Sequence, residues 1–563
     1  MSKRIIPLLL FFDGSACMGL AAGAHALGLD PNPAWGGARY ALLLLGASLI
    51  GASLLSTKWR APARIASILN SESVKTIAVL AHLWGLILLI YIWFITFGTF
   101  TSWTHTSHYY TRLADAFAQG QLHVDLPPGS LLDAADPYDP ASRAPFRDDI
   151  WDMSFYNEKL YFYWGPAPSL LLAPIQSLTG IQASDSQLVF WFLAGLLLFN
   201  SLSILKLWRR FFPALPAWNV FLCIALIGLI LPVPWEASAP YVYAVAVTAG
   251  AFFLMGGLYF ILPALDDSSF LPARDLCAAG FFWACAVGSR AILAIPVIFM
   301  SLVILARILT SLPAWKDWKR AAAPVLALFA PLAIGALLIG WYNWARFDSP
   351  FEFGVRYQIT TYNFNQRGSE IFQLAYVWRN LHAYLLQPFH LIREFPFIQP
   401  GILAENSIQA GANAASIYYT GRLAGILPGM PFLLFGFAPI FLQHIFFRPG
   451  LWTLKHFVLL LAGSSLTCFI SLLFYFNAQT RFLMDVISPF SLLAILGYWM
   501  TVSRLSRIQS RVARAAILLT ASVLICTILA GILLSVTGET GRLENFNPGL
   551  FYEIRAFLPS LHP

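Results

Sequence analysis

The chain has 563 residues, of which 58% are hydrophobic and only 11% are charged. Soluble globular proteins carry about 25% charged residues, so this composition excludes a water-soluble globular protein. Aromatic residues make up 15% of the chain and include 19 Trp residues, which is typical of proteins with much surface at bilayer interfaces. The composition therefore predicts an integral membrane protein, and the net charge of +8 has to be explained within that class.

Apolar segments long enough to cross a bilayer, about 20 residues each, recur along the chain. The run from Leu276 to Leu309 is too long for one helix and is interrupted at 288–290, which predicts a tight hairpin of two short helices. The sequence thus predicts an all-α polytopic membrane protein with about 13 transmembrane helices and two long extracytoplasmic loops. The predicted spans begin near Ile5, Tyr40, Thr76, Gln187, Trp218, Ala239, Leu276, Ala291, Ala321, Ala424, Leu454, Phe482 and Ala513.

The positions of Lys and Arg predict the orientation of these spans. With a cytoplasmic N-terminus, most of the 35 Lys and Arg residues fall in short cytoplasmic segments. The excess of positive charge is then a consequence of topology, and no nucleic-acid partner is expected. Two long loops, at about 101–184 and 344–422, and the C-terminal tail are predicted to lie on the extracytoplasmic side.

These features divide the chain into three parts. Residues 1–75 hold two spans and a cytoplasmic loop, residues 76–512 form the transmembrane core with both long loops, and residues 513–563 hold the last span and the outer tail. The first apolar run lacks a clean cleavage site and is interpreted as a retained helix rather than a signal peptide. The six Cys residues lie in apolar runs without a CxxC pair, so neither disulfides nor Cys-bound metals are expected.

The first long loop begins with a candidate base. Segment 108–120 predicts a short amphipathic helix on the membrane surface, because its apolar residues fall on one face and Gly120 supplies a stop. Asp115 lies in this segment, with His108 and Tyr110 within two turns of it. A carboxylate in such surroundings can accept a proton from an alcohol, although as a bare motif it favours a capping or ion-pairing role.

A second acidic stretch in the same loop precedes a cluster of aromatic residues. Two aromatic runs flank Asn157-Glu158-Lys159, which predicts a short hairpin, and Gly165-Pro166-Ala167-Pro168 then leads into a partly inserted segment or a helix start. Aromatic side chains beside carboxylates suit sugar binding, and they suit an interfacial belt equally well. The candidate residues of this stretch are Asp149, Asp152, Tyr161 and Tyr163.

Four arginines are predicted to lie at similar depth on the extracytoplasmic side. They are Arg290, Arg346, Arg356 and Arg481. Arg346 and Arg356 could clamp a phosphate, or they could pair with Asp348 and Glu352. Reaching toward lipid headgroups is the simplest role for each arginine, and convergence on one anionic lipid phosphate is the sharper hypothesis.

Several common functional classes lack their signatures in this sequence. There is no P-loop, no GxGxxG after a strand, no HExxH and no GxSxG. Charged residues within the spans are few, whereas ion-coupled transporters bury several at mid-depth. No His and carboxylate spacing recurs on a helix face, so no metal is expected.

Together these motifs resemble the GT-C superfamily of polytopic glycosyltransferases, in particular bacterial relatives of protein O-mannosyltransferases and aminoarabinose transferases. The resemblance extends over about residues 102–489. The residues that carry it are His108-Tyr109-Tyr110, Leu113-Ala114-Asp115-Ala116-Phe117, Gly120-Gln121-Leu122, Asp136-Pro137-Tyr138-Asp139, Asp152, Tyr156 to Pro168, Ser289-Arg290, Tyr342-Asn343, Arg346-Phe347, Pro350, Glu352-Phe353-Gly354, Tyr357, Arg481-Phe482 and Asp485.

The resemblance implies an inverting transferase of a bacterial cytoplasmic membrane that needs no cofactor. The donor would be a sugar on a polyprenyl phosphate, and the acceptor a hydroxyl of a lipid, glycan or protein. A loop carboxylate would act as base while arginines steady the leaving phosphate. Many members carry an acidic residue just before the Tyr of the first loop helix, but Ser107-His108 stands there in this chain.

The base is therefore assigned to Asp115 first and to Asp152 second. The candidate substrate-binding residues are His108, Tyr110, Asp149, Tyr161, Tyr163, Arg290, Arg346, Arg356 and Arg481. Two other functions fit an all-α membrane protein with these loops. A flippase or transporter of lipid-linked saccharides would call for inverted repeats or a polar central cavity, and a non-catalytic scaffold would leave Asp115 and Asp152 dispensable.

Overall fold

The computed structural model describes residues 5–25, 32, 34–58, 71–103, 107–143, 150–263, 272–310, 318–401, 416–446, 452–508, 510–558 and 560. This part of the chain is helical apart from three small two-stranded sheets. Ten of its helices are long and apolar enough to cross a membrane. They correspond to α1 (Ile5–Gly23), α2 (Gly37–Lys58), α4 (Glu72–Ile95), α7 (Asp185–Phe211), α10 (Val242–Ile261), α12 (Ala294–Thr310), α13 (Trp318–Phe347), α19 (Trp452–Leu473), α20 (Met484–Leu505) and α21 (Arg511–Thr537).

Two predicted spans are shorter than a bilayer requires. The span predicted near Trp218 is α8 (Ala217–Leu229), followed by the single-turn helix α9 (Val233–Ser238). The span predicted near Ala424 is divided into α17 (Ile426–Gly429), the 3₁₀ helix η10 (Pro431–Phe437) and α18 (Ala438–Phe446). The all-α polytopic architecture is confirmed, while the total of about 13 spans stays a prediction.

The interruption at Arg290 divides one apolar run into two helices, as the sequence predicts. Helix α11 (Ala273–Ser289) ends there, and the 3₁₀ helix η4 (Ala291–Leu293) leads into α12. Arg290 itself is extended, with φ −146° and ψ 112°. The arginine therefore stands at a helix end, where its side chain is not confined to a helix face.

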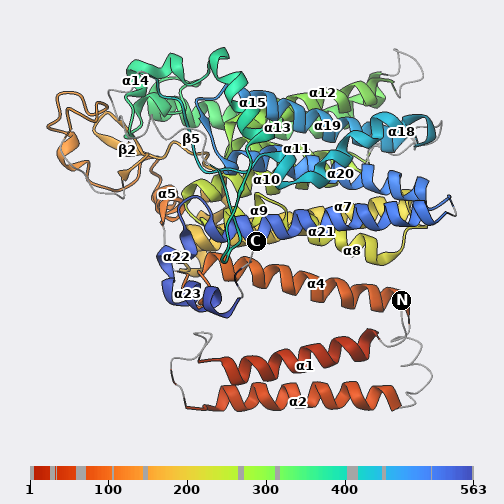
Figure 1. The fold of residues 1–563 in the computed structure, drawn as a ribbon. Helices are drawn as coiled ribbons and strands as arrows, with labels where there is room; N and C mark the ends of the chain where they lie inside the picture. Colours follow the sequence, from red (N-terminus) through yellow and green to blue (C-terminus); the bar gives the residue numbers. More distant parts are fainter. Residues whose placement is uncertain are drawn as a thin grey trace.

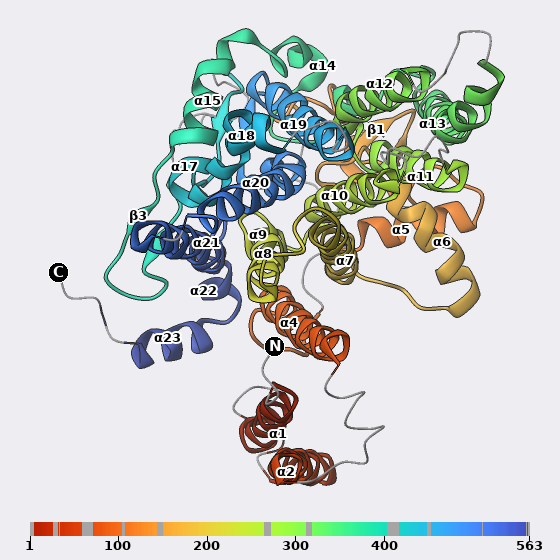
Figure 2. The same ribbon diagram turned by 90° about the vertical axis from the view of Figure 1, so that its right-hand side faces the viewer.

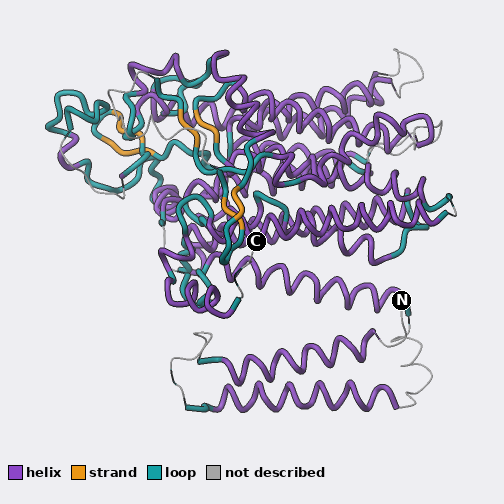
Figure 3. The backbone as a smooth tube through the Cα atoms, in the orientation of Figure 1, coloured by secondary structure: helices purple, strands orange, loops and turns teal. Residues whose placement is uncertain are grey.

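The long helices run side by side, and both long loops gather at one end of the bundle, called the loop end below (Figure 1). The small strands lie at this end too (Figure 3). Helices α1 and α2 form a hairpin beside α4, set apart from the other helices in both views (Figures 1 and 2). The loop end thus brings together the two segments in which the sequence places most of its candidate residues.

The α1–α2 hairpin is held together by small residues and joined to the core by a polar contact. A Cβ placed on Gly14 would lie 2.6 Å from the carbonyl oxygen of Gly46, so the two backbones approach closely. On the core side, His82 Nε2 of α4 lies 2.7 Å from Asp13 Oδ2 of α1. His82 Nδ1 lies 2.7 Å from the carbonyl oxygen of Ala78 and must donate to it, so a single proton is shared between His82 Nε2 and Asp13.

The first long loop contains the predicted amphipathic helix and hairpin. The helix is α5 (Tyr109–Ala118), and the hairpin pairs β1 (Ser154–Tyr156) with β2 (Lys159–Tyr161). A short 3₁₀ helix, η1 (Gly129–Leu131), lies between them, and α6 (Ala167–Thr179) follows them. Fully buried Asp185, at the start of α7, accepts the backbone N–H groups of Tyr109 and Tyr110 and so fixes where α5 begins.

The second long loop is built from short helices and strands around a small aromatic core. Its helix α15 (Val377–Leu386) packs on α19. Asn380 on α15 is fully buried, and its side-chain amide donates to the carbonyl oxygens of Leu472, Leu473 and Tyr475 at 3.1, 3.0 and 2.7 Å. These carbonyls end α19 and have no partner within the helix, so Asn380 fastens the loop to the bundle.

The remaining elements complete the loop end. The C-terminal helices pack on the end of α4, where Phe546 stacks on Phe97 and Asn547 donates to the Phe97 carbonyl oxygen. The second loop also contains η6 (Val355–Tyr357), α14 (Phe364–Arg367), η7 (Gly368–Glu370), η8 (Leu374–Tyr376), and the pair β3 (His390–Leu391) and β4 (Ile398–Gln399); β5 (Tyr419–Thr420) pairs with β6 (Asn477–Ala478), followed by η11 (Thr480–Leu483), and the tail contains α22 (Arg542–Phe546) and α23 (Pro548–Phe557).

We expect Asn380→Ala to lower the thermal unfolding midpoint of the detergent-solubilised protein. The change removes the side-chain donor from the carbonyl oxygens of Leu472, Leu473 and Tyr475, which corresponds to about 1–3 kcal/mol. Asn365→Ala, at an exposed asparagine of the same loop, is the matched control and should leave the midpoint unchanged. Equal midpoints for the two variants would show that Asn380 does not fasten the loop.

Candidate active site

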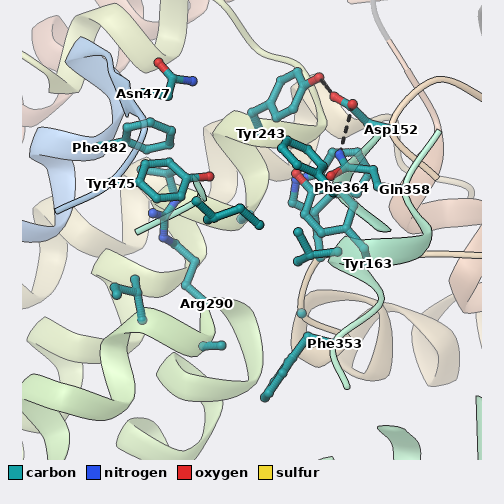
Figure 4. Close-up of a pocket in the computed structure, with 18 of the residues that line it drawn as sticks. Asp152, Tyr163, Tyr243, Arg290, Phe353, Gln358, Phe364, Tyr475, Asn477 and Phe482 are labelled. Carbon is teal, nitrogen blue, oxygen red and sulfur yellow. Dashed lines mark hydrogen bonds between the residues drawn. The ribbon is translucent and has the colours of Figure 1, made fainter. Parts of the chain in front are cut away.

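A cavity of about 470 Å³ lies where the two long loops meet the helix ends. Its walls come from both loops and from the ends of α10, α11, α13 and α19. Figure 4 shows Asp152 and Tyr243 on one side of this cavity and Arg290 on the other. Charged side chains from distant parts of the sequence therefore share one enclosed space.

Asp152 is the buried carboxylate of the cavity. Only 6% of its surface is exposed, and its backbone has a left-handed φ of 61°. The Tyr243 hydroxyl donates to Oδ2, and Gln358 Nε2 donates to Oδ1 at 2.9 Å. Burial raises the pKa of Asp152, while the bonds from Tyr243 and Gln358 and the charge of Arg481 act in the opposite direction.

The β1–β2 hairpin carries the chain from Asp152 into the cavity wall. Asn157 and Glu158 both have left-handed φ values, 46° and 60°, as the tight two-residue turns of hairpins require. Tyr163 and Gly165 follow β2 and line the cavity. A Cβ on Gly165 would lie 2.1 Å from the carbonyl oxygen of Gly288, so the absence of a side chain lets the loop lie against the end of α11.

Two arginines of the cavity keep donors that no protein group uses. A terminal nitrogen of Arg290 lies 3.0 Å from Oδ2 of buried Asp485. The guanidinium of Arg481 lies over the ring of Tyr243, 4.3 Å from its centre. Among the described residues, neither Arg290 Nε nor Arg481 Nε has a hydrogen-bond partner.

Arg346 also reaches the cavity, but protein groups occupy its nitrogens. Its Nε donates to the Tyr342 carbonyl oxygen, one terminal nitrogen to that of Phe162, and the other to Asn343 Oδ1 at 2.8 Å. The guanidinium also lies 3.7 Å from the centre of the Tyr342 ring. Arg346 is 4% exposed and joins α13 to the first loop.

Tyr342 adds a third unused donor to the wall of the cavity. Its side chain is 5% exposed, and its hydroxyl has no partner within the described part of the chain. Buried donors without partners are rare, because each forfeits the hydrogen bond it would make with water. The Tyr342 hydroxyl, Arg290 Nε and Arg481 Nε are thus donors without a described partner, on residues that line the cavity.

Within the described residues, no group of three or more His, Cys, Asp or Glu side chains could hold a metal ion. The side chains present could combine proton transfer at Asp152 with electrostatic stabilisation of an anion by Arg290, Arg481 and Tyr342.

Comparison with known proteins finds distant structural neighbours. No protein-family model and no curated protein matches the chain. The oligosaccharyltransferase of Archaeoglobus fulgidus in its apo form is similar at a TM-score of 0.46 and 14% identity, over 86% of this chain and 60% of that chain. ArnT from Cupriavidus metallidurans bound to undecaprenyl phosphate is similar at a TM-score of 0.40 and 12% identity, over 82% of this chain and 76% of that chain.

The chain spans less than two thirds of the length of the oligosaccharyltransferase that it matches.

Of the candidates named from the sequence, Asp152, Tyr163, Arg290, Arg346 and Arg481 line the cavity. Asp115, His108, Tyr110, Tyr161 and Arg356 do not, and the structure gives each of them a different setting.

Asp115, the first choice for the base, lies outside the cavity lining. Its carboxylate accepts the side-chain amides of Gln176 at 2.8 Å and Gln182 at 3.5 Å, which ties α5 to the segment around α6. His108 is exposed at the start of α5, and Arg356 is exposed with its guanidinium near the ring of Tyr357.

Two tyrosines and one aspartate complete the set. Tyr110 is fully buried, and its ring packs edge-on against Phe162. Tyr161, which lies on the hairpin, packs against Phe347 at the end of α13. Asp149 lies outside the described residues.

Sequence reasoning missed Tyr243, Gln358 and Thr360, whose side chains hydrogen-bond Asp152. Tyr243 lies at the start of a long apolar run, where an aromatic residue predicts an interfacial position and nothing more. Gln358 comes directly after Tyr357 in the second loop, and no spacing in the sequence distinguishes it. Only the positions of these residues in space reveal that all three contact the same carboxylate.

We expect Arg346→Met to destabilise the protein rather than to weaken anion binding. The change removes donors from buried carbonyl oxygens and from Asn343, which corresponds to about 2–4 kcal/mol. Thermal unfolding in detergent checks this, with Arg356→Met at an exposed arginine as the control. An unchanged unfolding midpoint together with loss of polyprenyl-phosphate binding would make Arg346 a ligand group instead.

Proposed function

We propose that this chain is an inverting glycosyltransferase that uses a polyprenyl-phosphate-linked sugar as donor and a hydroxyl of a lipid, glycan or protein as acceptor. One observation carries this proposal: a single cavity holds a buried carboxylate together with unused cationic and hydroxyl donors. Its volume of about 470 Å³ lies within the range of about 300–1,000 Å³ that is usual for small-molecule sites. We further propose that the loop end faces the extracytoplasmic side of a bacterial cytoplasmic membrane.

In the proposed reaction, Asp152 is the general base. Its carboxylate removes the proton of the acceptor hydroxyl as the hydroxyl oxygen attacks the anomeric carbon of the donor. The bond between that carbon and the phosphate oxygen breaks, and its electron pair leaves with the lipid phosphate. Attack from the face opposite the leaving group inverts the anomeric centre.

Arg290, Arg481 and the Tyr342 hydroxyl stabilise the leaving phosphate in this proposal. Negative charge on the phosphate increases as the bond to the sugar breaks, and donors already in place need little reorganisation to meet it. Asp485 holds Arg290 from behind, so the arginine keeps its position when the cavity is empty.

The site lies at the ends of membrane helices, which suits a donor that carries a lipid chain. Ile292 of η4 and Ile339 of α13 contribute apolar wall beside Arg290. A polyprenyl chain could remain in the bilayer while its phosphate reaches the arginines. A soluble nucleotide sugar would gain nothing from this position.

We expect purified protein in detergent to release sugar from a radiolabelled polyprenyl-phosphate hexose, and Asp152→Asn to lose that activity by about 10²-fold or more. Asp115→Asn is the matched control, since it makes the same change in the same loop outside the cavity. Loss of activity in Asp115→Asn with retention in Asp152→Asn would return the role of base to Asp115.

Two arginine variants test the phosphate site through the binding of polyprenyl phosphate to the purified protein. We expect Arg481→Gln to weaken binding of polyprenyl phosphate and Arg356→Gln to leave it unchanged. If no donor sugar is turned over while the lipid still binds, the protein is a flippase or transporter of lipid-linked saccharides. If the lipid does not bind at all, a non-catalytic scaffold is the remaining function.

The raised pKa of Asp152 predicts how activity depends on pH. The base works only when deprotonated, so activity is lost as the pH falls through the pKa of Asp152. Because burial raises that pKa, the acid limb of kcat/KM should have its midpoint above 3.8, the ordinary value for an aspartate. A pH–rate profile measures it, and a midpoint at or below 3.8 would contradict the assignment of Asp152.

A further inference from the structure

Tyr243 contacts both charged groups of the cavity. It lies in the first turn of α10, and its hydroxyl donates to Asp152 Oδ2. The guanidinium of Arg481 lies over the face of the same ring, 4.3 Å from its centre. The edge of the ring packs against Trp164, with the ring centres 5.4 Å apart. One side chain therefore connects the carboxylate to the cation.

The chemistry of a phenol under a cation strengthens this connection. A cation over an aromatic face attracts the electrons of the ring. Withdrawal of those electrons makes the hydroxyl a stronger donor, and a donor to a carboxylate favours its charged form. Tyr243 thus opposes the effect of burial on Asp152.

The position of the carboxylate also depends on this bond. Oδ1 is held by Gln358 of the second loop at 2.9 Å, so Tyr243 and Gln358 hold one oxygen each. A carboxylate has about four lone-pair sites, which leaves capacity for the proton of an acceptor. The other titratable groups that act on Asp152 or are acted on by it are Tyr163, Tyr419, Tyr475 and Arg481.

We propose that Tyr243 is a positioning residue that orients the Asp152 carboxylate, keeps it charged and links it to Arg481. This proposal rests on the proposed function, in which Asp152 is the base and Arg481 binds the leaving phosphate. Tyr243 need not touch the reacting atoms for this role, because it acts through Asp152.

The test is Tyr243→Phe, which removes the hydroxyl and keeps the ring that Arg481 and Trp164 contact. We expect the acid limb of the pH–rate profile to move up by about one to two pH units, because a hydrogen bond to the carboxylate is lost. At neutral pH, kcat should fall by about 10–100-fold because the base loses its orientation, while the donor KM changes little.

Tyr241→Phe is the matched control for this change. Tyr241 caps the same helix two residues earlier, and its hydroxyl bonds to Arg542 rather than to Asp152. In Tyr241→Phe, the acid limb of the pH–rate profile and kcat should equal those of the wild type. An acid limb in Tyr243→Phe that coincides with the wild-type limb would overturn the proposal.

A second readout separates this proposal from the proposed function. The carbonyl band of the protonated Asp152 carboxyl can be followed by infrared titration and assigned by its absence in Asp152→Asn. We expect the band to be formed at higher pH in Tyr243→Phe than in the wild type. A wild type without turnover on any donor would refute the proposed function, whereas titration at the same pH in both proteins would refute the role of Tyr243.

Discussion

The joint between the two long loops at Asp152 is the interaction on which the site depends. The backbone N–H of Asp152 donates to the Ile359 carbonyl oxygen at 2.9 Å, and the N–H of Ile359 donates back to Met153 at 2.8 Å. The Ser154 hydroxyl adds a bond to the Gly354 carbonyl oxygen. These main-chain hydrogen bonds set the register between the two loops. They place Gln358 opposite Asp152 whichever rotamers the two side chains adopt. Neither loop could form this carboxylate site alone.

Two carboxylates in the membrane helices are paired with a basic side chain, whereas the cavity keeps donors without partners. A buried charge is costly unless a partner compensates it, so Asp485 pairs with Arg290 and Asp13 with His82. In the cavity the pairing is incomplete, since Arg290 and Arg481 keep unused donors. Unused cationic donors that meet in one cavity suit the binding of an anionic ligand.

Local patterns in the sequence were sufficient for the architecture. Apolar length predicts the helices, the break at Arg290 predicts two helices instead of one, and Asn157-Glu158 predicts the hairpin, because each depends on neighbouring residues only. The site was predictable in part: Asp152, Tyr163 and the arginines at 290, 346 and 481 share the cavity. The sequence places Asp115 first, because His108 and Tyr110 lie within two turns of it on the same predicted helix. The two aspartates differ in their tertiary contacts. Gln176 donates to Asp115, whereas Tyr243, from a distant apolar run, donates to Asp152.

The contact between Asp13 and His82 has a consequence for how the chain enters the membrane. The α1–α2 hairpin packs on itself and precedes α4 in the sequence, so during synthesis it reaches the bilayer first. Until α4 arrives, Asp13 lies near the middle of α1 without its histidine, at a cost of about 2.5–3.5 kcal/mol for an aspartate at that depth. Insertion of α4 relieves that cost. The same contact that attaches the hairpin to the core in the finished protein thus favours the arrival of the next helix, which makes the order of insertion part of the fold.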